Sequence, residues 1–283
     1  MGDFIEEFSI GVIMMCKVSI ISGAYNVEKT LEKSINSILD QSYKNWEFII
    51  CDDGSNDKTL EILNTYKKKY PDKFLILKNE RNLGLNKSLN KCLNYVTGTY
   101  IARHDLDDYS KSDRLEKQVN YLEMNPEISL VGTNMEYMDE EGVWGRSQVV
   151  MSPTKKNFIK GTPFCHATIM LRNTVFEKVN GYSEKAYALR VEDYELWFRV
   201  YSKGFRGINL EEVLYTMYDN REAFNRRKFK YRLNESIVKY KGFRLLEISP
   251  IYYIQILRPL LIGALPYFIY KILRRKKLKV ENA

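Results

Sequence analysis

Three carboxylates stand within four positions in the segment "ARHDLDDYS" (102–110), where Asp105, Asp107 and Asp108 follow an apolar run. Like charges this close repel, and each raises the pKa of its neighbours unless a positive charge lies between them. Two explanations are open. The segment is either a solvated turn with a helix-capping residue, or a site for a divalent cation that prefers oxygen ligands, such as Mg²⁺ or Mn²⁺. For Asp108 we favour a structural role in the turn.

Two further acidic segments carry residue types suited to binding or catalysis. In "CDDGSND" either Asp52 or Asp53 can begin a turn, and we favour Asp52 for that role. In "VEDYELW", Glu192 and Asp193 precede a helical pattern. Asp193 can cap that helix, or it can act as a general base that takes a proton from a hydroxyl group.

The first hundred residues alternate between strand-like and helical patterns. Near-continuous apolar runs are typical of strands buried on both faces of a parallel sheet, and helical stripes separate them. This rhythm predicts an α/β fold with a mostly parallel sheet. The expected strands cover residues 17–21, 47–51, 74–77 and 99–102.

Ligands of open α/β sheets bind outside the carboxyl ends of the strands. The segments that hold Asp53 and Asp105 follow the second and fourth expected strands, so we expect both to face one crevice. A glycine-rich phosphate loop does not follow the first strand, which argues against a P-loop NTPase or a dinucleotide-binding protein.

The rest of the chain predicts a helix from residue 112 to Pro126, a strand over 128–133 and a hairpin over 138–145. A strand-like run over 162–172 contains His166. A helix begins at Glu192 and ends at Gly204, with Trp197 in the core.

Charge divides the chain into an acidic body and a basic tail. The whole sequence has a formal charge of +8, but the part from Arg221 onward has 16 Lys and Arg against four Asp and Glu. No nucleic-acid recognition module accompanies this charge, so we expect no nucleic-acid partner. Four scattered cysteines and two histidines argue against a zinc site and predict reduced thiols in a cytoplasmic protein.

The first residues have no basic n-region and no cleavage site of a secretory signal. We expect translation to begin naturally at Met14 or Met15. The predicted organisation is an N-terminal extension (1–14), a catalytic domain (15–215) and a basic, apolar helical tail (216–283).

Six segments in order resemble the family 2 glycosyltransferases, which have the GT-A fold; the resemblance covers about residues 17 to 215. They are "KVSIISGAYN", "EFIICDDGSNDKT", "RNLGLNKSLN", "ARHDLDDYSKSDRLEKQ", "CHATIMLR" and "VEDYELWFRV". The resemblance implies a nucleotide-sugar donor, usually a UDP-sugar, and inversion at the anomeric carbon.

The resemblance also implies roles for individual residues. Ala24, Tyr25 and Asp53 match the uridine pocket. Asp105 and Asp107 match the D-x-D pair: Asp107 would bind Mn²⁺ or Mg²⁺, and Asp105 would face the ribose or the water shell of the metal.

Asp193 matches the general base of the family. Glu192 and His166 are weaker candidates for contacts with the acceptor, and His166 can equally be a partly buried structural histidine.

The sequence departs from the family in two places. It has "GAYN" where "PTYN" is common, which changes the shape of the pocket. It lacks the Q-x-x-R-W string and the long membrane spans of processive synthases, so we expect transfer of one sugar at a time.

The tail from Ile251 is apolar but is interrupted by Arg258, Pro259 and Pro266, and it ends in a basic cluster. A transmembrane helix needs about 20 apolar residues. We therefore expect the tail to lie on an anionic membrane surface, at the cytoplasmic face of the bacterial inner membrane. The alternative is a pair of core helices with a charged, solvated end.

Such an enzyme would extend a polyprenyl-diphosphate-linked saccharide in O-antigen or capsule assembly. Two other functions stay open: a sugar nucleotidyltransferase, and a catalytically degenerate, membrane-bound scaffold.

Overall fold

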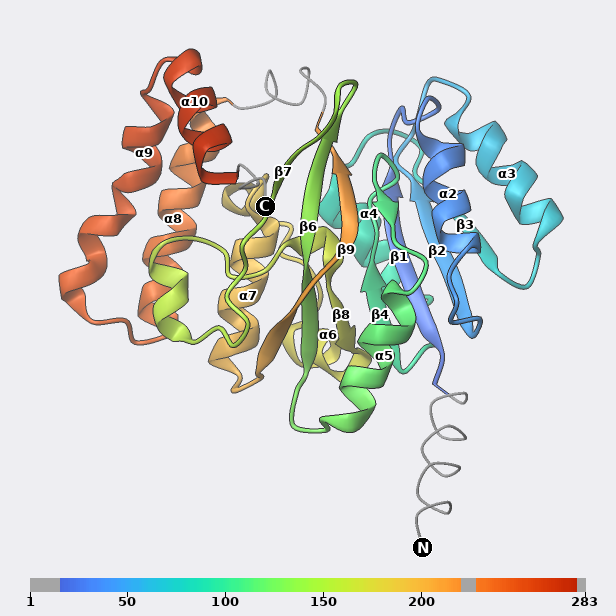
Figure 1. Cartoon of the computed structure of the whole chain (residues 1–283), viewed down its shortest axis with the longest axis horizontal. Helices are drawn as coiled ribbons and strands as arrows, with labels where there is room; N and C mark the ends of the chain where they lie inside the picture. Colours follow the sequence, from blue (N-terminus) through green and yellow to red (C-terminus); the bar gives the residue numbers. More distant parts are fainter. Residues whose placement is uncertain (1–15, 220–227, 279–283) are drawn as a thin grey trace, which may run out of the picture.

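The computed structural model describes residues 16–219 and 228–278, and its first hundred residues build the parallel part of one sheet (Figure 1). The expected N-terminal extension, with Met14 and Met15, lies outside the described residues. The four predicted strands are present and pair in parallel in the order β3-β2-β1-β4. They are β1 (Val18–Ala24), β2 (Trp46–Asp52), β3 (Phe74–Lys78) and β4 (Tyr100–Arg103).

The sheet as a whole is mixed, because antiparallel pairs join it beyond β4, although β6 and β9 are again parallel. Strand β8 runs antiparallel to both β4 and β6, and β9 is parallel to β6 but antiparallel to β5. The predicted hairpin joins β6 to β7. The regular alternation of strand and helix that predicts parallel pairing ends at Arg103. The added strands are β5 (Tyr109–Ser110), β6 (Leu130–Asp139), β7 (Gly142–Arg146), β8 (Met170–Arg172) and β9 (Gly207–Tyr218).

Alternate residues of the central strands feed two hydrophobic layers. Val18 and Ile20 of β1 pack with one set of helices, and Ile21 packs with the other. Helices α2 (Leu31–Leu39), α3 (Thr59–Lys69) and α5 (Arg114–Met124) cover the first face. Helices α4 (Leu85–Leu93), α6 (Asn173–Val179), α7 (Glu192–Ser202) and α8 (Phe229–Leu245) cover the second.

The segment 162–172 is not the continuous strand that its apolar pattern predicted. It contains the 3₁₀ turn η2 (His166–Thr168), and only the three residues of β8 pair in the sheet. The side chain of Thr168 accepts from Thr133 N–H (3.0 Å), which holds the turn against β6 without strand pairing. Two further 3₁₀ turns are η1 (Lys155–Ile159) and η3 (Ala186–Ala188).

Helix α8 belongs to the core, although it lies in the part of the chain that we expected to be a tail. Val238 and Phe243 are buried in the same cluster as Trp197. Lys239 is buried, and its ammonium group donates to the carbonyls of Ile159 and Gln255, at 3.2 Å each. The predicted boundary at residue 215 falls inside β9.

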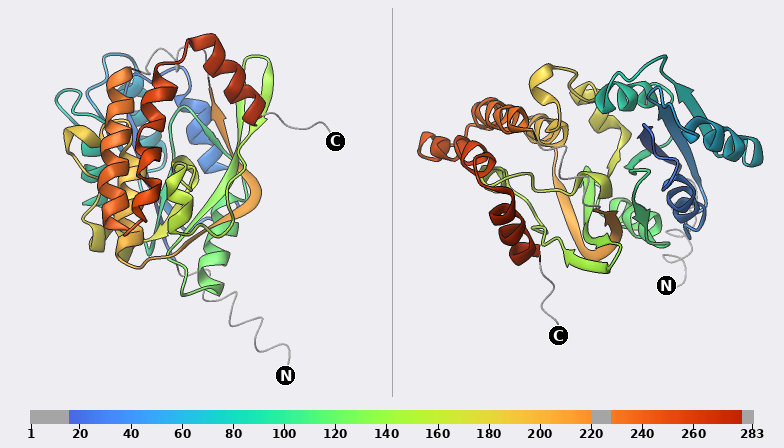
Figure 2. Two further views of the ribbon diagram at one scale, coloured as in Figure 1. Left: turned by 90° about the vertical axis from the view of Figure 1, so that its left-hand side faces the viewer. Right: turned by 90° about the horizontal axis from the view of Figure 1, so that it is seen from above.

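Three short elements follow α8; the first two lie beside it, and the third turns away from it (Figure 2). They are η5 (Pro250–Ile256), α9 (Arg258–Gly263) and α10 (Tyr267–Leu278). Helix α9 lies beside α8, and α10 returns toward β7. Among the described residues, no helix is long and apolar enough to span a membrane.

The contact between α7 and α8 gives a first prediction. A Cβ atom at Gly242 of α8 would overlap the buried ring of Phe198 of α7. Overpacking of this kind costs about 1–3 kcal/mol. We therefore expect Gly242→Ala to lower the melting temperature by several degrees, at about 2–4 °C per kcal/mol for a domain of this size.

The matched control is Gly161→Ala, because no heavy atom lies within 4 Å of a Cβ built at Gly161. Differential scanning calorimetry compares the two variants with the wild type. Equal melting temperatures for all three proteins would show that α8 does not pack tightly on α7.

Candidate active site

The carboxyl ends of β1, β2 and β4 meet at one edge of the sheet, as we predicted. Ala24 lies opposite Asp52 and Ile21 lies opposite Arg103 in the strand register. The D-x-D turn follows β4 directly, and the N–H of Asp108 donates to the carbonyl of Asp105 (3.1 Å) across it.

Two buried arginines lie beneath this turn. The guanidinium of Arg103, only 1% exposed, forms an ion pair with Asp105 and donates to the carbonyls of Ile21 and His104. Arg114, fully buried, donates to the carbonyl of Arg103 (3.0 Å) and lies over the ring of Tyr215 (5.3 Å). Positive charge inside the protein therefore balances part of the negative charge of the turn.

Asp108 points inward and anchors the turn to β9. Its Oδ1 accepts from the N–H of Tyr218 (2.9 Å), while its buried Oδ2 has no hydrogen-bond partner among the described residues. Burial, and then the charges of Asp107 and Asp105, raise the pKa of Asp108 well above its usual value. One carboxyl oxygen in this acidic group is thus unpaired.

A cavity of about 680 Å³ joins the D-x-D turn to the start of α7. Asp105, Asp107 and Asp108 line it together with Glu192 and Asp193, so the structure brings the predicted metal residues and the predicted base to one cavity. Its wall is formed by Leu85, Asp105, Asp107, Asp108, Thr162, Arg190, Val191, Glu192, Asp193, Tyr194, Met217, Tyr218, Asp219, Lys228, Tyr231, Arg232, Glu235 and Tyr270.

Asp193 has the electrostatic character of a general base. Burial, and then the negative charges of Glu192 and Glu235, raise its pKa to about 7, although the backbone N–H groups of Asp193 and Tyr194 at the start of α7 oppose the rise. A base works best when its pKa lies near the working pH. Burial also raises the pKa of Glu192, which Arg190 and Arg103 partly counter.

Asp53 is buried and already accepts three hydrogen bonds. Oδ1 accepts from the side-chain amide of Asn79 (2.8 Å) and from Leu83 N–H (2.9 Å), and Oδ2 accepts from Gly84 N–H (2.8 Å). The carboxylate therefore fixes the loop that leads into α4. One lone pair of Oδ2 is left for a ligand.

The remaining predicted nucleotide residues lie beside Asp53. The carbonyl of Ala24 accepts from the N–H of Asp53 (2.7 Å), and the Ala24 methyl group is buried in the core. Tyr25 is 43% exposed. Ala24, Tyr25 and Asp53 are all absent from the described lining of the cavity, although we expected Asp53 to face one crevice with Asp105. Of the three, only Tyr25 has an exposed side chain.

His166 is not among the described residues that line the cavity. Its imidazole contacts the rings of Tyr182 and Trp197, and its Nε2 lies 3.2 Å from the hydroxyl of Tyr182. Burial and the charge of Arg103 lower its pKa well below its usual value, so it is neutral. Trp197 is fully buried, as predicted.

Sequence reasoning missed two groups of residues. The first is Arg103, which lies in the segment "ARHDLDDYS". A charged residue at the end of a buried strand could have indicated that it pairs with a carboxylate of the turn. The contribution of α8 and α10, through Lys228, Arg232 and Tyr270, had no local signal, because tertiary packing brings these helices to the cavity.

The acidic turn fits a divalent cation that is shared with a substrate. No three His, Cys, Asp or Glu side chains are arranged as a complete metal cluster in the described part of the chain. Mg²⁺ is commonly held by one or two carboxylates together with substrate phosphates. Asp105 and Asp107 at the cavity wall provide this kind of donor set.

The fold and this acidic cavity are those of a nucleotide-sugar glycosyltransferase. Residues 19–179 match the family described as "Glycosyl transferase family 2", which is more than half of the chain. The protein therefore belongs to glycosyltransferase family 2, and it is an enzyme that uses a nucleotide-sugar donor.

Relatives that match most of the chain include bacterial glycosyltransferases. The Bacillus subtilis (strain 168) protein named "Putative glycosyltransferase EpsE" is 46% identical over 250 residues, which is 88% of this chain and 90% of the relative. The Escherichia coli enzyme WfaP is 32% identical over 227 residues, 78% of this chain and 84% of its own. Its name is "UDP-Glc:alpha-D-GlcNAc-diphosphoundecaprenol beta-1,3-glucosyltransferase".

Solved structures with low sequence identity support the fold. S. aureus TarS 1–349 in complex with UDP-GlcNAc has a TM-score of 0.66 at 19% identity, and the match covers 88% of this chain and 82% of that one. The match to a longer TarS structure covers 89% of this chain but only 44% of the TarS chain. A mannosyltransferase from Pyrobaculum calidifontis, in complex with GDP-Man and Mn²⁺, gives 0.59 at 17% identity, covering 92% and 79%.

The raised pKa of Asp193 predicts a pH-dependent effect on stability. Between its ordinary pKa of 3.8 and the folded value of about 7, the folded state binds a proton that the unfolded chain has lost. The stability of the wild type therefore falls as the pH rises through this window. We expect Asp193→Asn to melt at a higher temperature than the wild type, with a gap that grows from pH 4 to pH 7 and then levels off.

We also expect this variant to lose about 10²–10⁴-fold in kcat, which is the contribution of a positioned general base. Melting curves at each pH measure the first effect and sugar transfer the second. Asp72→Asn, at an exposed position, is the control. A gap that does not change with pH would mean that Asp193 is ionised throughout this range.

Proposed function

We propose that this enzyme transfers one sugar at a time, with inversion, from a UDP-sugar to a polyprenyl-diphosphate-linked saccharide in the assembly of a bacterial surface polysaccharide. The observation that carries the proposal is the single cavity that holds both the D-x-D turn and a carboxyl group with a pKa near 7. The acidic turn would hold a cation against the departing diphosphate, and the separate carboxyl group would take the proton of the acceptor hydroxyl.

Asp107, with Asp105 beside it, would hold Mn²⁺ or Mg²⁺. Such a cation supplies positive charge against the diphosphate as it leaves. Arg103 holds the carboxylate of Asp105 from below, so Asp105 is turned partly toward the interior and is suited to the ribose or to metal-bound water. Asp107 is then the better candidate for direct coordination.

Asp193 would take the proton from the acceptor hydroxyl. Its deprotonated form dominates above its pKa of about 7, so transfer should rise with pH through neutrality. With Asp193 as base, the hydroxyl attacks the anomeric carbon directly, which inverts its configuration. Glu192 lies beside the base on the cavity wall and would contact the acceptor, whereas His166 would act indirectly through Tyr182.

The nucleotide would bind at the ends of β1 and β2. Tyr25 offers an exposed ring for the base, Ala24 contributes backbone, and Asp53 has one free lone pair toward an N–H donor. The names of WfaP and of the TarS complex, which contain UDP-Glc and UDP-GlcNAc, support a UDP-sugar donor.

A thermal-shift titration tests the donor and the cation together. We expect UDP with Mn²⁺ to raise the melting temperature. At a hundredfold excess over Kd, binding to the folded state alone adds about 2.7 kcal/mol to the free energy of unfolding. GDP or CMP with Mn²⁺, or UDP without Mn²⁺, should shift it much less. Asp107→Asn should abolish the cation-dependent part, and Asp72→Asn should keep it.

No shift with any nucleotide would overturn the donor assignment and favour the degenerate scaffold. Sugar-1-phosphate with UTP tests the nucleotidyltransferase alternative, since that enzyme would release pyrophosphate from the pair.

The acceptor should be presented at a membrane, and the elements after α8 have a surface suited to this. Large apolar side chains are exposed along η5, α9 and α10, at Ile251 (77%), Ile254, Leu261 (69%), Phe268 and Ile272. Exposed apolar patches mark interaction sites. The basic charge from Arg221 onward favours an anionic partner, and Tyr270 of α10 lines the cavity itself. We place the enzyme at the cytoplasmic face of the inner membrane.

Vesicle sedimentation tests this surface. Replacing Ile251, Ile254, Leu261, Phe268 and Ile272 with Ser should lower binding to phosphatidylglycerol vesicles at least tenfold, since each buried side chain of this size contributes about 1.5–3 kcal/mol. Exposed Met124, Val143 and Met151 replaced with Ser form the control. Equal retention of both variants would place the membrane contact elsewhere.

A further inference from the structure

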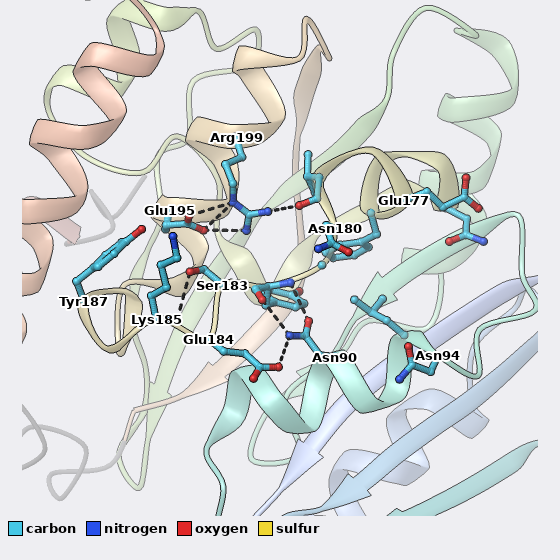
Figure 3. Close-up of a pocket in the computed structure, with 16 residues that line it drawn as sticks. Asn90, Asn94, Glu177, Asn180, Ser183, Glu184, Lys185, Tyr187, Glu195 and Arg199 are labelled. Carbon is cyan, nitrogen blue, oxygen red and sulfur yellow. Dashed lines mark hydrogen bonds and ion pairs between the residues drawn. The ribbon is translucent and has the colours of Figure 1, made fainter.

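A second hollow, of about 810 Å³, lies between α4, α6, α7 and the loop 180–187 (Figure 3). It is separate from the acidic cavity, although it shares α7 with it. Glu192 and Asp193 of α7 line the acidic cavity, and Glu195 and Arg199 of the same helix line the second hollow.

Hydrogen bonds hold the loop that forms one wall of this hollow. Asn90 of α4 donates to the carbonyl of Tyr182 and to Glu184 (2.9 Å each) and accepts from the N–H of Tyr182 (2.8 Å). Asn180 and Gly181 have positive φ angles of 56° and 64°, and a Cβ at Gly181 would lie 2.6 Å from the Asn90 side-chain oxygen. The wall is therefore formed in advance of any ligand.

An ion pair fixes the opposite wall. The guanidinium of Arg199 donates to both carboxylate oxygens of Glu195 at 2.8–3.0 Å, and it also donates to the carbonyl of Val179. Figure 3 shows this pair facing the loop across the hollow. Since the two charges neutralise each other, the pair shapes the site without making it a site for anions.

Several polar side chains around the hollow have no partner in the described part of the chain. The amides of Asn94, Asn173 and Asn180 and the carboxylate of Glu177 make no side-chain hydrogen bond there, although all four residues line the hollow. Figure 3 shows Asn94, Asn180 and Glu177 on the side away from Tyr187. These groups can both donate and accept hydrogen bonds toward a ligand.

The composition of the wall matches a neutral ligand rich in hydroxyl groups. Outside the Glu195–Arg199 pair, the carboxylates of Glu177 and Glu184 outnumber the single ammonium of Lys185, which disfavours phosphates. The ring of Tyr187, beneath the ammonium of Lys241 at 5.0 Å, adds an aromatic face. Amides, carboxylates and an aromatic ring are together suited to the alternating hydroxyl groups and C–H faces of hexose rings.

We propose that this hollow is a second saccharide-binding site, which holds a neutral stretch of the acceptor or product chain away from its reacting end. The loop that forms it continues to Arg190 and Val191 of the acidic cavity, and the hydroxyl of its Tyr182 lies 3.2 Å from Nε2 of His166. That the ligand is a glycan chain rests on the proposed function. That the ligand is neutral and rich in hydroxyl groups rests only on the residues that line the hollow.

Saturation-transfer NMR on the full chain tests the site with cellotetraose, maltotetraose and chitotetraose. We expect at least one of them to bind, and to stay bound when UDP and Mn²⁺ are saturating. Asn94→Trp, which fills the hollow, and Asn180→Gly, which removes an amide at a position where glycine accepts the positive φ, should each lower affinity at least tenfold. Asn64→Trp, at an exposed position of α3, is the control for Asn94→Trp.

Binding that follows this pattern supports the site. Binding by none of the three tetrasaccharides, displacement by UDP and Mn²⁺, or unchanged affinity in both hollow variants would each overturn it. The UDP thermal shift is measured on the same samples, so failure of the second site is distinguished from failure of the donor assignment.

Discussion

The candidate active site depends on the ion pair between Arg103 and Asp105. The guanidinium of Arg103 is buried and carries a full charge at the end of a buried strand, and the carboxylate of Asp105 balances that charge. A buried charge that loses its partner is strongly destabilising, so neither residue is free to change alone. Arg114 and Tyr215 support the pair from below, and Tyr215 accepts from the N–H of Asp105 (3.0 Å). The position of the D-x-D turn is therefore fixed from inside the protein, and the cavity side is left for a ligand.

Hydrophobic periodicity and turn residues predicted the elements whose formation depends mainly on nearby residues. The four parallel strands, the helix at Glu192 and the hairpin between β6 and β7 follow from periodicity and turn residues, and all are present. The closeness of the segments that hold Asp53 and Asp105 could be expected from their places after β2 and β4, because parallel strands end at a common edge. The place of Asp193 beside Asp105 and Asp107 was expected only from the family resemblance.

The failures have a common physical origin in long-range packing. The apolar run around His166 reads as a strand, but a turn bonded to Thr133 satisfies its backbone instead. The basic segment after residue 215 reads as a separate tail, yet Phe243 of α8 is as deeply buried as any residue of the sheet. In the same way, no sequence window reveals that Arg232 and Tyr270 face Asp105, because the contact forms only in the assembled core.

The participation of α8 and α10 in the wall of the acidic cavity has a consequence for biosynthesis. The D-x-D turn follows β4 but is anchored to β9 through Tyr215 and Tyr218, and the cavity wall needs residues up to Tyr270. A domain generally folds as a unit. A fragment released before α10 is translated would therefore lack part of the cavity wall.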